Sequence, residues 1–477
     1  MGGSSGILVG QICAKLNNSL KGERGRCMQS FVDNPMRQTP RASSLPVTAA
    51  RGKADATPWL TLTERRKRWL FALYLLFVAA CSIWNGTIEA RRNDPWAIGD
   101  WLINYDGGFI RRGLTGALVM ILHRATRIPL AWAVFSIQAS VFVLFLVCVY
   151  KLSKGIRWSY LMAAVLLSPA TLAFTTLDAI SGLRKEILLF AALGLTIYAL
   201  VCGRLKDWQL SAMLGVFLVG VVLAHEGLLV VAPYFFAAVV IETMSLRRAI
   251  RICIIPFALA GIALVAVMLH HGNRAAAEAI CSSVGGQMAK PGVYLANGGI
   301  CAGAISALSL NVSEEHAGMM GWIFLRHLPR LYSLLVIPSF APLLLLMSRF
   351  YRRDRLRYEV VAVLTCALVS VPGMAVLCYV GSDWGRWIHL QTVSLMLLAI
   401  MIDRKAGAAR SEHAKWRTKR FQVIATVVLF FYATAWTLPG FGNWGASPGY
   451  LAFFWPTYRD GLHQLRLDVV ARIRKVG

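Results

Sequence analysis

Acidic, basic and glycine residues are interleaved in a short segment that follows the first long apolar run of the chain. Residues 104–113 read NYDGGFIRRG and bring Asp106 close to Arg111 and Arg112. Two adjacent arginines offer planar, bidentate donors to a phosphate or carboxylate, and their charge does not titrate away near neutral pH. A nearby carboxylate could accept a proton from an attacking hydroxyl. The segment therefore predicts an anion-binding turn with Asp106 as general base, although a tight turn with solvated charges would have the same sequence.

Four further connections between apolar runs carry ionisable residues, most of them beside glycine. They are TTLDAISGLRKE with Asp178, Arg184, Lys185 and Glu186, AHEG with His225 and Glu226, HHGNR with His270, His271 and Arg274, and GSDWGRW with Asp383 and Arg386. Ionisable groups at membrane depth are costly and are functional candidates by default. We take Glu226 as the second candidate base. The candidates for substrate binding are Arg111, Arg112, Asp178, Arg184, Lys185, His225, Arg274, Asp383 and Arg386.

Simpler explanations exist for single members of this set. Arginines near a membrane surface often reach lipid headgroups without any further role. His225 and Glu226 could be a satisfied pair at a helix end. Asp383 and Arg386 could form a local ion pair that locks a hairpin. The argument for function depends on the collection, because all five connections are expected on one face of the membrane.

The elements that position these residues are long apolar runs. Of 477 residues, 57% are hydrophobic and only 15% are charged. Runs of this length predict membrane-spanning helices, since a lipid-embedded backbone must pair its polar groups within its own segment. We expect an all-α, polytopic helical membrane protein with about eleven transmembrane helices, at residues 69–85, 130–150, 158–174, 187–202, 210–224, 227–243, 252–269, 331–348, 360–380, 388–402 and 421–437.

The distribution of basic residues predicts the orientation. The sequence ERRKR at residues 64–68 precedes the first run, so by the positive-inside rule that end is cytoplasmic. We expect residues 1–57 to form a disordered basic cytoplasmic tail, because they are rich in Gly, Ser, Arg and Pro without an apolar period. Residues 58–440 form the membrane domain, and residues 441–477 form a C-terminal segment that we place on the outer side.

Two outer loops are long, at residues 86–129 and 270–330. The stretch 114–122 is too short to cross a bilayer and predicts a helix at the outer interface. The second loop holds Cys281 and Cys301, the two cysteines that are both extramembrane and outside. An oxidising compartment favours a disulfide between them, and two free, small apolar side chains are the alternative.

Several chemistries lack their motifs. The formal net charge of +27 suggests nucleic acid at first, but Lys and Arg are spread over short loops and not gathered on a soluble module, so we expect no nucleic-acid partner. A phosphate-binding glycine loop ending in Lys-Ser or Lys-Thr is missing, as are HExxH and CxxC, and we expect no serine nucleophile elbow. We therefore expect no metal and no cofactor.

The arrangement resembles bacterial inner-membrane enzymes that use polyprenyl-diphosphate-linked sugars. Acidic residues after the first span, followed by a short interfacial helix, are similar to GT-C-type glycosyltransferases, a resemblance that implies a catalytic carboxylate at Asp100 or Asp106. The outward arginines and the long loop with Arg274 resemble Wzy-type polymerases and O-antigen ligases, in which an arginine precedes a glycine by eleven positions, as Arg274 precedes Gly285. GFIRRG, GLRKE and DWGRW also resemble membrane proteins associated with polysaccharide clusters. We expect no soluble outer domain after the last span, which is a departure from many GT-C enzymes.

Together these features predict a glycosyltransferase or polymerase of cell-surface or exopolysaccharide synthesis in the bacterial inner membrane. Its partners would be a polyprenyl-diphosphate-linked saccharide and membrane lipids, with other polysaccharide-assembly proteins as further candidates. The alternative is a transporter or flippase of lipid-linked saccharides that has the same anion-binding cavity. A site near the membrane midplane would favour the alternative.

Overall fold

The structure is a computed structural model that describes residues 63–203, 205–288, 299–310, 313–314, 316–317, 328–406, 419–440 and 449–450. The chain divides into two units, Met1–Ala56 and Thr57–Gly477. The expected disordered tail lies outside the described residues. So does the expected C-terminal segment, apart from residues 449 and 450.

The regular structure of the described residues is helical, which confirms the all-α fold. In chain order the helices are α2 (Glu64–Arg92), η1 (Gly99–Leu102), α3 (Gly113–Thr126), α4 (Leu130–Ser153), α5 (Tyr160–Leu167), α6 (Phe174–Leu177), α7 (Ala179–Gly182), α8 (Glu186–Cys202), α9 (Asp207–Ala224), η2 (Glu226–Val231), α10 (Ala232–Thr243), α11 (Leu246–Leu269), α12 (Arg274–Ser283), η3 (Gly299–Cys301), η4 (Ser306–Ser309), α14 (Leu328–Tyr351), η5 (Asp354–Leu356), α15 (Arg357–Val380), α16 (Trp384–Lys405) and α17 (Lys419–Thr434).

Eight helical segments among the described residues are long and apolar enough to cross a membrane. They contain eight of the expected spans, and the shorter apolar helices α8 and α17 correspond to two more. The protein is therefore a multi-pass membrane protein. The remaining expected span, 158–174, is not one continuous helix, because α5 ends at Leu167 and Ser168 is extended, with φ −58° and ψ 135°. Pro169 follows Ser168, and a residue before proline is sterically excluded from the helical region.

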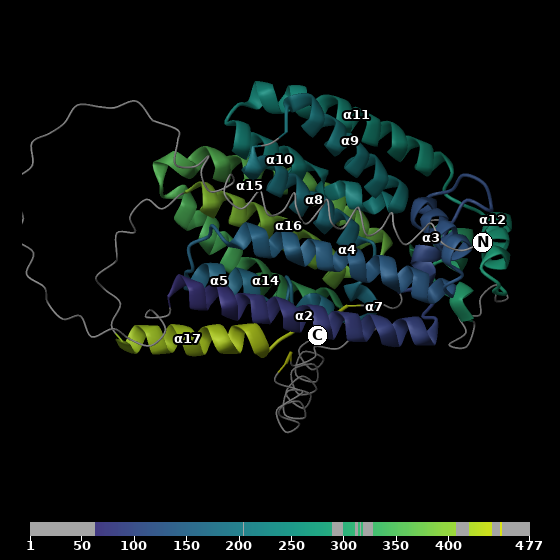
Figure 1. Cartoon of the computed structure of the whole chain (residues 1–477), viewed down its shortest axis with the longest axis horizontal. Helices are drawn as coiled ribbons and strands as arrows, with labels where there is room; N and C mark the ends of the chain where they lie inside the picture. Colours follow the sequence, from purple (N-terminus) through teal and green to yellow (C-terminus); the bar gives the residue numbers. More distant parts are fainter. Residues whose placement is uncertain are drawn as a thin grey trace, which may run out of the picture. The chain divides into compact units, whose positions relative to one another are not determined.

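Helix α16 is the most deeply buried of these spans. In its most apolar window 89% of the residues are buried, compared with 22% for the span that contains α15. Figure 1 shows α16 in the middle of the helices, and it packs against α4, α8, α10, α14 and α15. A helix in this position contacts protein on every side, so it can carry polar side chains that a lipid-facing helix could not.

The polar side chains of α16 have partners on the surrounding helices. His389 forms a hydrogen bond through Nδ1 to the carbonyl oxygen of Ala170, at 3.0 Å. The hydroxyl of Tyr234 on α10 donates to the side-chain oxygen of Gln391. In a membrane, such interhelical hydrogen bonds hold helices together where lipid offers no polar alternative.

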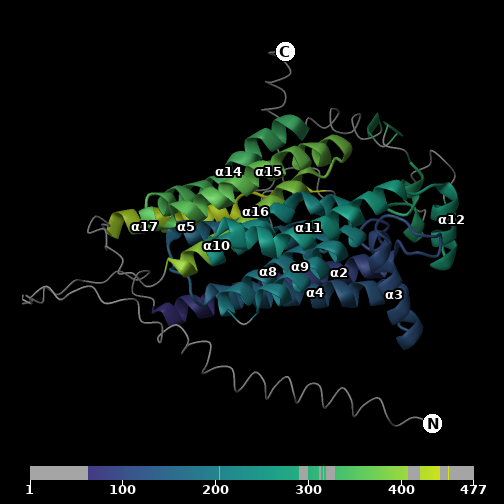
Figure 2. The same cartoon turned by 90° about the horizontal axis from the view of Figure 1, so that it is seen from above.

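The loop that precedes α3 packs against residues on both sides of α12 at one end of the helices, which Figures 1 and 2 show from two directions. The main-chain amide of Arg111 donates to the carbonyl oxygen of His270 at 3.0 Å, and the amide of Ala304 donates to that of Pro95 at 3.1 Å. Helix α3 contains the predicted short helix at 114–122. The described residues of the two loops expected to be long and outward therefore pack into one folded layer.

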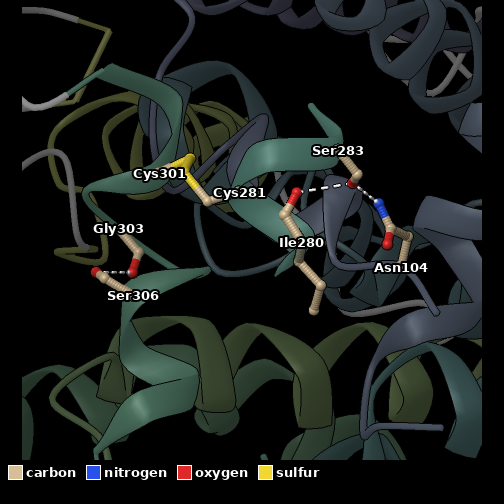
Figure 3. Close-up of a disulfide and its surroundings, with 7 residues drawn as sticks. All are labelled: Asn104, Ile280, Cys281, Ser283, Cys301, Gly303 and Ser306. Carbon is tan, nitrogen blue, oxygen red and sulfur yellow. Dashed lines mark hydrogen bonds between the residues drawn. A yellow bond between two sulfur atoms is a disulfide. The ribbon is translucent and has the colours of Figure 1, made fainter. Parts of the chain in front are cut away.

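A disulfide between Cys281 and Cys301 cross-links two parts of the second loop within this layer, as the sequence predicts. Figure 3 shows it joining α12 to the end of η3, with Asn104 of the first loop alongside. The amide nitrogen of Asn104 donates to the hydroxyl of Ser283 at 2.9 Å. The cross-link therefore fixes the part of the second loop that contacts the first.

Candidate functional site

Nine charged side chains form two sets of ion pairs at the end of the helices that carries the folded loops, and a hydrogen bond from Lys185 to the carbonyl oxygen of Arg112 joins the two sets into one network. They come from all but one of the five connections singled out in the sequence and from η1. They are Asp100, Arg111, Arg112, Arg184, Lys185, Glu186, Glu226, Asp383 and Arg386.

The accessible edge of the network is the pairing of Arg111 and Arg112 with Glu226. The Arg112 guanidinium contacts both carboxylate oxygens of Glu226, with distances of 2.8 to 3.1 Å, and Arg111 lies 3.6 Å from one of them. The side chains of Arg111 and Arg112 are 17% and 22% exposed. The RRG turn is therefore not a turn with freely solvated charges, and its arginines retain some contact with the surroundings.

The backbone of this turn is strained. Arg112 has φ 66° and ψ 9°, a left-handed conformation that costs a non-glycine residue about 1–2 kcal/mol. Gly113 follows as the first residue of α3, and a Cβ atom there would overlap the ring of Tyr105. The strain persists because the side chain and the carbonyl group of Arg112 both have partners in the network.

Lys185 connects the arginine turn to Asp100. Its ammonium lies 3.5 Å from Asp100 and donates to the carbonyl oxygen of Arg112 at 3.2 Å. The side chains of Lys185 and Asp100 are fully buried. Lys185 is a predicted substrate-binding residue, and in the structure its ammonium is buried and contacts Asp100 and the main chain of Arg112.

The second half of the network connects the start of α8 to the start of α16. Arg386 lies 2.8 Å from Glu186 and 3.0 Å from Asp383. Arg184 lies 3.2 Å from Asp383 and 3.9 Å from Asp100. The Asp383–Arg386 pair thus exists, but it is part of the larger network and does not only lock a local hairpin.

Burial and neighbouring charges together shift the pKa values of the buried groups that lie outside the spans. Burial raises the pKa of Asp100, but the charges of Lys185 and Arg184 outweigh it, so the pKa lies well below its usual range. Burial lowers the pKa of Lys185 to about 8, against the opposing charge of Asp100. Burial and the nearby Arg112 lower the pKa of His225, so its ring is neutral near pH 7.

Four predicted site residues lie outside the ion pairs of the network. Asp106 is exposed on its glycine loop, where its amide donates to Asn104. Asp178 caps α7 by accepting from the amide of Ser181. His225 is buried at the end of α9 and accepts from the amide of Gly227. Arg274 pairs with Glu278 on the exposed side of α12, at 2.8 Å.

Two members of the network were not selected as site residues from sequence, Asp100 and Glu186. Both are charges of the outer connections in the sequence; a role for Asp100 comes only from the family resemblance, and Glu186 has none. Their signal is weak, because each is a single acid beside an apolar run. The structure shows that they neutralise Lys185, Arg184 and Arg386.

The described network contains five basic and four acidic side chains, so it carries an excess of positive charge. Most of its charges are buried and neutralise one another. The accessible part is the edge formed by Arg111, Arg112 and Glu226. Guanidinium groups at such an edge can bind an oxyanion by paired hydrogen bonds, and the buried carboxylates beneath them maintain their positions.

Residues 69–302 match a family described as "Uncharacterised membrane protein Rv1490". The matched stretch contains both cysteines of the disulfide and every network residue except Asp383 and Arg386. Searches of curated proteins and of solved structures gave no match. The similarity therefore supports a membrane protein and leaves its chemistry to be inferred from the site.

Proposed function

We propose that the protein is a membrane glycosyltransferase or polymerase that joins saccharides carried on a polyprenyl diphosphate, at the outer face of the bacterial inner membrane. An acceptor hydroxyl attacks the anomeric carbon of the donor sugar. The bond between that carbon and the diphosphate oxygen breaks, and the diphosphate leaves as an anion on its lipid. The attacking hydroxyl gives its proton to a carboxylate of the protein.

The observation that carries this proposal is a pair of accessible arginines, Arg111 and Arg112, at the edge of a network of buried ion pairs. A leaving diphosphate develops negative charge, and fixed positive groups that meet this charge lower the barrier. Arg111 and Arg112 are positioned by Glu226 and by the connection through Lys185 to Asp100. They therefore need little rearrangement when the anion arrives.

Asp106 is the better of the two candidate bases. Glu226 is occupied by Arg112 through both of its oxygens, which makes it a positioning group for the arginines. Asp106 is exposed and lies on the loop that leads into the arginine turn. We assign the proton transfer to Asp106 and the neutralisation of the diphosphate to Arg111 and Arg112. Arg184 and Arg386 add positive charge from their buried positions in the network.

A transporter or flippase for the same lipid is the second candidate. The observation that favours it is the interruption between α5 and α8, where the chain forms only the short helices α6 and α7. Discontinuous helices are common at transporter binding sites. Against it, the network lies at one end of the spans.

The test uses cells whose only copy of the protein is a variant, with the saccharide extracted from both membrane leaflets and from the cell surface. Arg112→Ala and Asp106→Ala should abolish polymer and leave single lipid-linked units on the outer leaflet. Arg248→Ala is the matched control, because Arg248 forms an exposed ion pair with Asp207 at 2.8 Å that lies outside the network.

The site variants and the control distinguish the enzyme from the flippase and from a non-specific effect. Normal polymer from both site variants, at wild-type levels of membrane protein, rejects the proposed enzyme. Units that accumulate on the inner leaflet instead of the outer one support the flippase. Loss of polymer in the Arg248→Ala control as well would show that any perturbed ion pair has this effect, and that the network has no special role.

A further inference from the structure

Three aromatic rings lie next to the arginine turn, and the proposed reaction does not use them. Tyr105 and Phe109 are stacked, with ring centroids 5.7 Å apart and an interplanar angle of 15°. His270 meets Phe109 edge-on, at 5.2 Å and 81°. Phe109 is 45% exposed in a polar, glycine-rich loop.

Contacts fix these rings relative to the turn. The ring of Tyr105 packs against the backbone of Gly113, immediately after Arg112. The carbonyl oxygen of His270 accepts the main-chain amide of Arg111 at 3.0 Å. The aromatic group and the arginine turn are therefore connected on two sides and form one surface.

Polar groups border the same rings. Asp106 is exposed between Tyr105 and Phe109 in the sequence, and Gly108, with φ 96°, leaves open space beside them. Nδ1 of His270 donates to the carbonyl oxygen of Ala266 at 2.8 Å, so Nε2 is the ring nitrogen that can contact a ligand. The surface thus combines an exposed aromatic side chain with acceptors for hydroxyl donors.

We propose that Tyr105, Phe109 and His270, together with Asp106, form a binding site for one sugar ring of a saccharide. This inference rests on the proposed function and names the part of the site that holds the sugar next to the anion. The C–H groups on one face of a pyranose carry small positive charge and are apolar, so they pack on the negative face of an aromatic ring. The sugar hydroxyls then donate to Asp106 and to Nε2 of His270.

A purely lipid-facing role would have a different chemical requirement. Aromatic side chains are enriched at membrane interfaces. For anchoring in lipid, however, leucine replaces phenylalanine with little loss, because what counts there is apolar area. Binding of a sugar needs the flat π face, which tyrosine retains and leucine lacks. The series Phe109→Leu and Phe109→Tyr therefore separates the two roles.

The experiment uses the full-length chain in lipid nanodiscs and measures saturation transfer by NMR to the methyl glycosides of glucose, galactose, mannose, N-acetylglucosamine and N-acetylgalactosamine. We expect transfer to the ring C–H protons of at least one glycoside. Phe109→Leu should reduce this transfer at least fivefold, whereas Phe109→Tyr should preserve it. Phe77→Leu is the matched control, because Phe77 is 46% exposed on the spanning helix α2.

Two results would overturn the proposal. One is the absence of transfer to any of the five glycosides, and the other is equal transfer in the wild type and in Phe109→Leu. The outcome is also separate from that of the proposed function. Glycoside binding that depends on Phe109, combined with normal polymer in Arg112→Ala and Asp106→Ala cells, would retain the sugar site and reject the transferase.

Discussion

The ammonium group of Lys185 lies 3.2 Å from the carbonyl oxygen of Arg112 and donates a hydrogen bond to it. The two residues are 73 positions apart, in two different connections between spans. The same ammonium contacts Asp100 at 3.5 Å. Lys185 thus joins three segments and supports the strained turn that presents Arg111 and Arg112.

Replacement of Lys185 by methionine should lower the free energy of unfolding by about 3–5 kcal/mol, because it leaves the carboxylate of Asp100 buried with one partner fewer. Thermal unfolding of the protein in detergent measures this change. Lys67→Met is the control, since Lys67 pairs with the 54% exposed Glu64, and it should cost less than about 1 kcal/mol. In the double variant Lys185→Met, Asp100→Asn part of the stability should return. A double variant as unstable as the sum of the single ones would contradict the pairing.

Lys185 also predicts a pH dependence. Its pKa in the folded protein is about 8, below the ordinary value of 10.5, chiefly because of burial. Between these two values the unfolded chain binds more protons than the folded one, so the contribution of Lys185 to stability rises with pH in this window and is constant below it. Unfolding of the wild type and of Lys185→Met should be compared from pH 7 to pH 10.5. A difference between them that stays flat across this range would refute the assignment.

The left-handed conformation of Arg112 can be tested by comparing two truncations. Arg112→Ala and Arg112→Gly both remove the guanidinium, but glycine adopts positive φ without a steric penalty. Arg112→Gly should therefore be more stable than Arg112→Ala by about 1 kcal/mol, measured by thermal unfolding. Both variants should lose the proposed activity to the same extent. Equal stability of the two would show that the turn is not strained in the native protein.

Gly385, the residue before Arg386, lies where α16 meets the chain that follows α17. A Cβ atom there would overlap the carbonyl oxygen of Pro439. Gly385→Ala should displace the start of α16 and lower the unfolding temperature markedly. Gly261→Ala on α11 is the control, because nothing lies within 4 Å of its Cβ position, and alanine favours a helix by roughly 1 kcal/mol relative to glycine. The prediction fails if both variants unfold at the same temperature.

The disulfide should stabilise the folded loops. Removal of both cysteines, as Cys281→Ser with Cys301→Ser, should cost about 2–4 kcal/mol, because the cross-link restricts the unfolded chain. Thermal unfolding of the non-reduced protein measures the loss, and reduction of the wild type should reproduce it. Cys81→Ser is the control, since Cys81 is a free cysteine on α2. Reduction that leaves the unfolding temperature unchanged would contradict a stabilising role.

The fold class could be predicted from the sequence because a backbone in lipid has few ways to satisfy its hydrogen bonds. An apolar run long enough to cross a bilayer must satisfy its own backbone, so length and composition predict a helix directly. The exception at residues 158–174 has a local cause in Pro169, which ends α5. The disulfide was also predictable, because Cys281 and Cys301 were the two cysteines expected in an outer loop.

The roles of the charged residues were less predictable, because the spacing of residues within one segment does not show which distant side chain each of them pairs with. Asp106 and Arg112 are close in sequence, yet the carboxylate that binds Arg112 is Glu226, which is 114 positions away. The sequence by itself determined that this chain is a bundle of membrane helices with ionisable residues concentrated in a few connections. The reason is that the hydropathy of each side chain does not depend on the fold, so apolar runs and charged connections can be read directly along the chain. Only the tertiary structure decided which of these charges are buried supports, such as Asp100 and Lys185, and which remain accessible. Burial and ion pairing depend on how the helices pack.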